Sequence, residues 1–259
     1  MSAGTTNAEL VAVAVAAARA AAPELLERFD RGAVGVSSKS TATDLVSEAD
    51  LAAERTIREL LARERPEDAI MGEEGEDTPG TSGLRWIVDP LDGTINYLYG
   101  HPQWCVSVAC EDRAGVVFDP VRDELWAVAV GERPTLNGEP LADLGPAPEL
   151  GAALLATGFG YAAEIRAAQA QIAVRMLPRV RDLRRAGAAA LDLAWAAAGR
   201  LDAYYEHGVK PWDIAAGTLL CEGVGLHVEP LPATDALPPG ILTAPPELAG
   251  ELRALVDDA

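Results

Sequence analysis

The chain has 259 residues, 49% of them hydrophobic, so it can bury a substantial core as one large domain or as two closely packed halves. Its 40 acidic residues outnumber 21 basic residues and give a formal net charge of −19, which opposes binding to nucleic acid or to an anionic membrane. Cys105, Cys110 and Cys221 lack C-x-x-C or Cys/His metal spacing, so we expect reduced thiols in a cytoplasmic protein and no zinc site.

The first quarter of the chain predicts two helices separated by a polar loop. Residues 7–29 are rich in alanine and leucine, but an arginine and a proline interrupt the apolar run, which favours a packed surface helix over a membrane anchor. Residues 32–43 are small, polar and β-branched and predict a mobile hairpin that carries Lys39. Residues 47–61 open with Ser-Glu-Ala-Asp, which is typical of a helix start with acids in its first turn.

Two acidic residues follow a short apolar run near the middle of the first half. Residues 84–88 predict a buried strand, and the proline after Asp89 has no N–H group, so we expect the chain to leave the sheet there. Asp89 and Asp92 would then emerge together at the strand end. Gly93 permits close approach of a ligand, and Thr94 opens a short helix whose free N–H groups suit a phosphate. A solvated Asp-Gly turn is the alternative explanation of this local pattern.

Two further acidic sites lie at the edges of apolar runs. Glu73 and Glu74 follow a predicted strand that ends near residue 71. Asp213 lies in the first turn of a predicted helix that begins at Trp212. Because open α/β sheets collect ligands at strand ends and helix starts, we expect these acids to converge on one site with Asp89 and Asp92.

The rest of the chain predicts an antiparallel sheet, then a Pro-rich linker at residues 146–151, then a second α/β half. Turns at 112–113 and 119–120 separate the strands of that sheet. The predicted strands are 105–109, 115–118, 124–130, 154–158, 201–205 and 241–243, and the predicted helices are 161–177, 188–198 and 246–256.

Three segments together resemble the inositol monophosphatase family: Glu73-Glu74, Asp89-Pro90-Leu91-Asp92-Gly93-Thr94 and Trp212-Asp213, in that family's order and at its approximate spacing. The resemblance extends over nearly the whole chain. It implies a single domain, residues 1–259, whose halves are residues 1–145 and 146–259, with an α/β fold of alternating helix and sheet layers (αβαβα). It also implies a Mg²⁺-dependent, commonly lithium-sensitive phosphatase that forms a homodimer.

The resemblance assigns roles to individual residues. The implied metal ligands are Glu73, Asp89, the Leu91 carbonyl, Asp92 and Asp213. The implied catalytic residues are Glu73, Asp50 and Thr94, with Asp50 paired to Thr94 to orient the attacking water, although helix capping alone also explains Asp50. The implied substrate contacts are Glu73, Leu91, Asp92, Gly93, Thr94, Arg185, Glu206 and Asp213, and Lys39, Asp44 and Glu74 are implied near the site.

Two of these positions bear on the alcohol that is bound. Glu206 matches the acid that bonds a substrate hydroxyl in the family. Arg185 stands where animal enzymes carry a serine, and Ala188 replaces a hydroxyl residue common there, which puts the identity of the alcohol in doubt. A solvated surface charge is the alternative explanation of Arg185.

The proposed ligands are all hard oxygen atoms with no nearby His or Cys, which favours Mg²⁺, or Mn²⁺ as a substitute, over zinc. The sequence has no P-loop and no G-x-S-x-G motif, and its three histidines are scattered, so covalent catalysis is disfavoured. We therefore expect inositol monophosphate hydrolysis in which cations activate a water and stabilise the leaving alkoxide. The alternatives are phosphatases for histidinol phosphate, fructose 1,6-bisphosphate or 3′-phosphoadenosine compounds, and a non-catalytic partner of a transcription complex.

Overall fold

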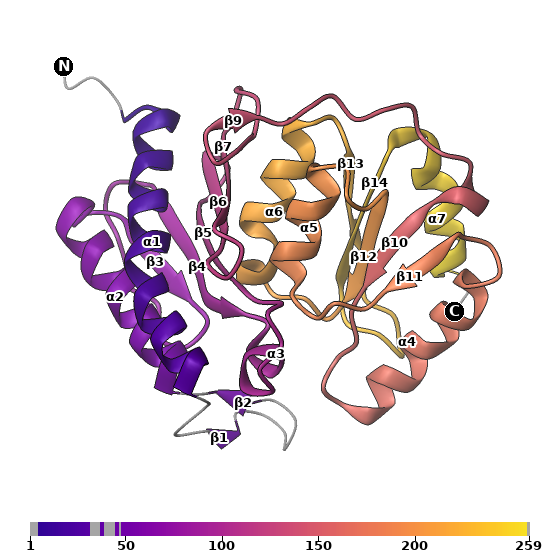
Figure 1. Ribbon diagram of the computed structural model, residues 1–259, viewed down its shortest axis with the longest axis horizontal. Helices are drawn as coiled ribbons and strands as arrows, with labels where there is room; N and C mark the ends of the chain where they lie inside the picture. The colour runs from indigo at the N-terminus through magenta and orange to yellow at the C-terminus, as the bar shows by residue number, and fades with distance from the viewer. Residues whose placement is uncertain (1–4, 32–36, 39–44, 47, 258–259) are drawn as a thin grey trace.

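The computed structural model of the chain describes residues 5–31, 37–38, 45–46 and 48–257. Its helices and sheets form five alternating layers, as the resemblance implied (Figure 1). The outer helices of the first half are α1 (Asn7–Arg31) and α2 (Glu48–Glu64), the helices between the two sheets are α5 (Ala189–Ala197) and α6 (Pro211–Gly223), and the outer helices of the second half are α4 (Ala163–Met176) and α7 (Pro246–Asp257).

The first sheet has its strands in chain order, with β3 parallel to β4 and every other neighbouring pair antiparallel. Its strands are β3 (Ala69–Gly72), β4 (Arg85–Asp92), β5 (Cys105–Cys110), β6 (Ala114–Asp119), β7 (Glu124–Ala129), β8 (Thr135–Leu136) and β9 (Glu139–Pro140). Every residue of β5 and β6 is buried, because helices cover both faces of the sheet. This explains the continuous apolar runs from which these strands were predicted.

The second sheet is mixed, in the order β11-β10-β12-β14-β13. Its strands are β10 (Leu154–Thr157), β11 (Asp182–Arg184), β12 (Ala203–His207), β13 (His227–Leu231) and β14 (Gly240–Ala244). The sequence did not predict β11 or β13. Both lie at sheet edges, where polar residues and a proline are tolerated, so their strand signal is weak. A short 3₁₀ helix, Leu150–Ala152, ends the predicted linker.

Strand β4 continues past the point where we expected it to leave the sheet. Asp89 pairs with Ser107 and Asp92 pairs with Cys105, with a shift of register between the two pairs. The prediction of an end at Pro90 was therefore wrong. A bulge accommodates the missing N–H group of a proline within a strand, and it turns both aspartates toward one end of the sheet.

The short helix predicted at Thr94 is present as α3 (Thr94–Leu98). The Tyr97 hydroxyl donates to the Leu25 carbonyl of α1 at 2.7 Å, and the Tyr97 ring centroid lies 5.3 Å from that of Phe29 and 5.2 Å from that of Trp104. These contacts fix α3 against the first layer. No helix among the described residues is both long enough and apolar enough to span a membrane.

The predicted hairpin before α2 lies mostly outside the described residues. Of residues 32–43, the structure describes β1 (Ser37–Ser38), which pairs antiparallel with β2 (Leu45–Val46) just beyond the predicted segment. Lys39 and Asp44 are not among the described residues.

The central helices approach each other closely where α6 carries glycine. A Cβ atom at Gly217 would lie only 2.5 Å from the Leu193 Cβ of α5. The N-terminal ends of α5 and α6 both reach one pocket, so the close contact between the two helices fixes its wall.

We predict opposite effects for the same substitution in two helices. Gly217→Ala should lower the free energy of unfolding by about 1–3 kcal/mol, because the Leu193 Cβ is fixed to its helix and cannot rotate away. Gly250→Ala in α7, where nothing lies within 4 Å of the new Cβ, should raise it by up to about 1 kcal/mol through helix propensity. Urea denaturation of both variants measures the difference. Equal stabilisation by both would contradict the close helix contact.

Candidate active site

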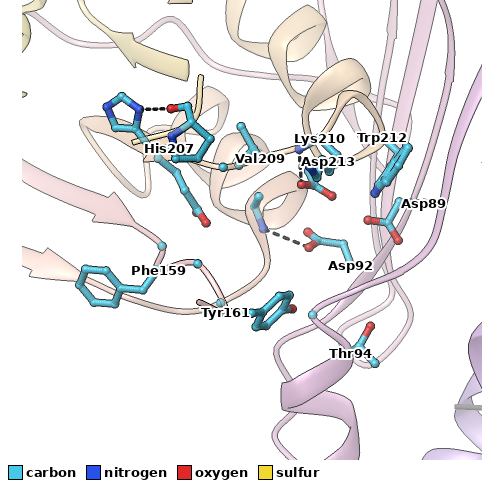
Figure 2. Close-up of a pocket in the computed structure, with 18 of the residues that line it drawn as sticks. Asp89, Asp92, Thr94, Phe159, Tyr161, His207, Val209, Lys210, Trp212 and Asp213 are labelled. Atoms are coloured by element: carbon cyan, nitrogen blue, oxygen red, sulfur yellow. Dashed lines mark hydrogen bonds between the residues drawn. The ribbon is translucent and has the colours of Figure 1, made fainter. Parts of the chain in front are cut away.

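A pocket of about 390 Å³ opens between the two sheets, at the N-terminal ends of the central helices (Figure 2). Its lining combines the ends of β3 and β4 and the start of α3 with the loops around β10, β11 and β12 and the start of α6. The predicted site residues that line it are Glu73, Asp89, Leu91, Asp92, Gly93, Thr94, Arg185, Glu206 and Asp213. Segments far apart in the sequence therefore meet at one cavity.

Four other predicted residues are not among the described residues that line the pocket. Asp50 lies behind the pocket wall and contacts Thr94. The backbone N–H of Glu74 donates to Glu54 at 2.7 Å, and Glu74 is not among the residues that line the pocket. Lys39 and Asp44, as noted, fall outside the described residues.

Asp89 is held at the base of the pocket by the β4 bulge. Its Oδ1 accepts the N–H of Leu91 at 3.0 Å, and the side chain is 1% exposed. Burial raises its pKa well above the usual value, and the neighbouring Glu73, Asp92 and Asp213 raise it further. Without a bound cation, the charged form of Asp89 is therefore repelled by the neighbouring carboxylates of the cavity.

Asp92 caps the first turn of α5 from the opposite half of the molecule. Its two oxygens accept the N–H groups of Ala189 at 3.2 Å and Ala190 at 2.7 Å, as Figure 2 shows in part. Burial raises the pKa of Asp92 to about 6, while the two helix N–H groups oppose this rise. The helix start thus orients the carboxylate and favours its charged form.

Cys105 lies directly against Asp92, contrary to our expectation that no cysteine is near the site. Its thiol donates to Asp92 Oδ2 at 3.6 Å, because the two residues are paired between β4 and β5. Burial and the Asp92 charge raise the Cys105 pKa well above its usual value, so the thiol stays protonated. A protonated thiol is a donor to the carboxylate and not a soft metal ligand.

Asp213 is oriented by the start of α6. Its Oδ2 accepts the backbone N–H of Lys210, the residue before the helix, at 2.6 Å, and Pro211 begins the helix. Burial and the Asp92 charge raise the Asp213 pKa well above its usual value, although the Lys210 N–H opposes the shift. Figure 2 shows the Asp213 and Asp92 carboxylates turned toward the same part of the pocket.

Thr94 and Asp50 form the contact that the resemblance implied. The Thr94 hydroxyl lies 3.0 Å from Asp50 Oδ1 and 3.1 Å from the Leu91 carbonyl oxygen. A hydroxyl donates to one acceptor at a time, and its lone pairs can still accept from a water. Asp50 is 0% exposed, so Thr94 is its link to the pocket.

Glu206 stands on the wall formed by the second sheet. Burial raises its pKa to about 7, while the Tyr204 hydroxyl and the Arg185 charge favour the ionised form. Near neutral pH this group can therefore either accept or donate a hydrogen bond to a bound hydroxyl.

The comparisons with known proteins identify the family of the chain. The model of the inositol monophosphatase family matches residues 6–256. The chain belongs to the inositol monophosphatase family.

Relatives and solved structures match the chain over most of its length. It is 40% identical over 242 residues to the inositol-1-monophosphatase of Mycobacterium bovis, covering 88% of this chain and 83% of that protein. It is 39% identical over 231 residues to the Nus factor SuhB of Xylella fastidiosa, covering 87% and 83%. The structure of Mycobacterium tuberculosis SuhB superposes with a TM-score of 0.82 at 38% identity, covering 98% of each chain.

The donor set fits the divalent cation on which the inositol monophosphatase family typically depends. The acids that line the pocket offer only oxygen atoms, and burial together with their mutual repulsion raises the pKa of Asp89, so positive charge is favoured there. Among the described residues, no three Asp, Glu, His or Cys side chains are already grouped as a preformed metal site. Mg²⁺ usually keeps several waters and takes only a few carboxylates, so separated acids with fixed orientations suit it.

Several pocket residues were not predicted from the sequence. Tyr161 and Phe159 come from the loop after β10, and Figure 2 shows the Phe159 ring turned away from the acids. Lys210 and Trp212 come from the start of α6. The loop position was predictable, since it follows a predicted strand end in an α/β fold. Lys210 was missed because nothing in its spacing separates it from a surface charge.

We predict that the metal-free protein loses stability as the pH rises from about 4 to about 6. Burial raises the pKa of Asp92 to about 6 in the folded state from 3.8 in an exposed aspartate, so the folded state holds more protons in this range. Its free energy of unfolding then falls with pH, by up to about 3 kcal/mol for Asp92 alone, since one pKa unit corresponds to about 1.4 kcal/mol. Urea denaturation in EDTA across this range measures the slope.

Asp89→Asn should weaken this pH dependence, because it removes one of the coupled acids yet keeps an oxygen to accept the Leu91 N–H. The control Asp143→Asn changes a side chain that is 91% exposed and should leave the slope at the parent value. A metal-free parent that gains stability over this range would contradict the proposed repulsion.

Proposed function

We propose that the chain is a Mg²⁺-dependent phosphomonoesterase that hydrolyses inositol monophosphate to inositol and phosphate. The observation that carries this proposal is the convergence of Glu73, Asp89, Asp92 and Asp213 from both halves on one pocket, with Glu206 on the wall of the same pocket. Inositol-1-monophosphatase relatives at about 40% identity over most of the chain support the same reaction.

We propose that Glu73, Asp89, Asp92, Asp213 and the Leu91 carbonyl hold the cations. When bound, Mg²⁺ neutralises phosphate charge and lowers the pKa of a nearby water. The orientation of the acids comes from the chain itself, through the bulge N–H of Leu91 at Asp89 and the helix starts at Asp92 and Asp213. Fixed donors of this kind need little reorganisation during the reaction.

The attacking water is held, in this proposal, by the Thr94 hydroxyl and Glu73. Asp50 accepts a hydrogen bond from the Thr94 hydroxyl. A lone pair of that hydroxyl therefore stays available to accept a hydrogen bond from the water. Gly93, with a φ of +95°, turns the backbone so that the N–H groups of Gly93 and Thr94 can meet the phosphoryl oxygens. A Cβ at Gly93 would lie 2.7 Å from the Gln103 carbonyl oxygen, so glycine is required.

The alcohol is recognised at the wall formed by the second sheet. Glu206 and Arg185 line that part of the pocket, and Tyr161 contributes an aromatic side chain that is 43% exposed. A carboxylate beside a guanidinium suits a hydroxylated ring more than an apolar alcohol. Histidinol phosphate, fructose 1,6-bisphosphate and 3′-phosphoadenosine compounds remain the alternative substrates.

A non-catalytic role is the alternative of another class, because several relatives carry the name Nus factor SuhB. The complete set of acids favours catalysis. We further propose that residues 1–259 act as one domain in a cytoplasmic homodimer, a location supported by the three buried, free cysteines.

The deciding experiment measures phosphate release from inositol 1-phosphate, histidinol phosphate, fructose 1,6-bisphosphate and 3′-phosphoadenosine 5′-phosphate. We expect the highest kcat/KM for inositol 1-phosphate with Mg²⁺, less or equal turnover with Mn²⁺, and none with Zn²⁺ or EDTA, since the site offers hard oxygen ligands. Full activity after exhaustive chelation would refute the metal mechanism. No turnover of any ester with Mg²⁺ present would favour the non-catalytic alternative.

A second test concerns the Thr94 hydroxyl. Thr94→Val keeps the shape of the side chain but removes the donor to buried Asp50, so turnover should fall by about 100-fold or more. Thr94→Ser keeps the hydroxyl and should retain most of the activity. Steady-state kinetics on inositol 1-phosphate, with melting temperatures to verify folding, separate the two. Comparable turnover in both variants would rule out a role for the hydroxyl.

A further inference from the structure

Two adjacent tyrosines of β12 point to opposite faces of the second sheet. Tyr204 packs in the apolar cluster that includes α5 and α6, whereas Tyr205 packs in the cluster that includes α4 and α7. Because side chains alternate along a strand, Glu206 emerges on the same face as Tyr204 and reaches the pocket there. Tyr204 itself does not line the pocket and lies beneath it.

The Tyr204 hydroxyl has a specific acceptor. The side chain is 0% exposed, and its hydroxyl donates to Glu206 Oε2 at 2.8 Å. A phenylalanine would fill the same apolar space without burying a polar atom, so packing alone does not explain a tyrosine here. A hydrogen bond to an ionised carboxylate is strong and directional, and it fixes which oxygen faces the protein.

Gly158 confines the same carboxylate from the neighbouring strand. Thr157 pairs with Tyr205 in the parallel β10–β12 ladder, so Gly158 comes next to Glu206. A Cβ at Gly158 would lie 1.9 Å from Glu206 Oε2 and 2.1 Å from its Cδ. The φ of Gly158 is not in the left-handed region, so glycine is required for space and not for backbone conformation.

We propose that Tyr204 is a positioning residue that, with Gly158, holds the Glu206 carboxylate in the orientation that selects polyhydroxylated alcohols. The inference rests on the proposed function, in which Glu206 bonds a hydroxyl group of the substrate. Tyr204 acts only through Glu206 and touches neither the phosphate nor the reacting water. Its removal therefore affects recognition of the alcohol and not the hydrolytic step.

The test compares two esters that differ in hydroxyl groups, inositol 1-phosphate and phenyl phosphate, in the Mg²⁺-loaded enzyme. Tyr204→Phe should lower the ratio of kcat/KM for inositol 1-phosphate over phenyl phosphate on the order of tenfold, chiefly through a higher KM for inositol 1-phosphate. Tyr205→Phe removes the hydroxyl of the adjacent tyrosine on the opposite face and should leave the ratio at the parent value. A merely structural role for Tyr204 predicts an equal loss for both esters.

Two more variants test whether Tyr204 acts through Glu206. Gly158→Ala places a methyl group where the carboxylate lies, at the flexible end of that side chain, so it should also lower the ratio while changing the melting temperature little. In a double-mutant cycle, Tyr204→Phe should lower the ratio in the parent but not in a Glu206→Ala background, which leaves no side-chain acceptor for the Tyr204 hydroxyl.

The outcomes separate this inference from the proposed function. If Glu206→Gln lowers the ratio but Tyr204→Phe does not, the positioning role of Tyr204 is overturned and the proposed function stands. If Glu206→Gln leaves the ratio unchanged, Glu206 does not bind the alcohol, and the role of Tyr204 is overturned with it. Additive losses in the double variant would also overturn the inference, because they require Tyr204 to act independently.

Discussion

The contact between Asp92 and the first turn of α5 joins the two halves of the molecule at its site. One carboxylate from the end of β4 receives two N–H groups from a helix that begins almost a hundred residues later. Those N–H groups would otherwise lack an intrahelical partner. These two hydrogen bonds therefore satisfy the start of α5 and also fix the Asp92 carboxylate at the pocket, so the fold and the site depend on one another.

That dependence has an electrostatic cost within the protein. Burial and mutual repulsion raise the pKa values of Asp89, Asp92 and Asp213, and each is offset in part by backbone donors at a bulge or a helix start. The donors are not enough to neutralise the cluster. The cations that we propose for this site would relieve the remaining repulsion, so the same arrangement of acids that destabilises the protein alone would favour cation binding.

Local patterns in the sequence predicted individual strands and the convergent acids: continuous apolar runs for strands covered on both faces, and acids directly after them. The alternating layers were implied only by the resemblance to the family. The prediction failed where the register between strands determines the structure. The extension of β4 past Pro90 depends on a bulge opposite Cys105, and the closeness of Cys105 to Asp92 follows from that register. Edge strands β11 and β13 gave no signal because an edge tolerates polar residues and proline. The sequence did not single out Gly158 or Tyr204, because both matter through their contact with Glu206. Gly158 meets Glu206 from a neighbouring strand, and Tyr204 lies two residues before it.

The two sheets contribute different parts of the site. The first sheet and α3 supply Glu73, Asp89, Asp92 and Thr94, which we propose bind the cations and the attacking water, whereas β12 supplies Glu206, which we propose bonds the alcohol. Because Glu206 is set by Tyr204 and Gly158 within the second sheet, its position can change without moving any of the acids in the first. A fold built in this way can keep one hydrolytic centre while the alcohol it accepts is altered by a few residues of a separate sheet.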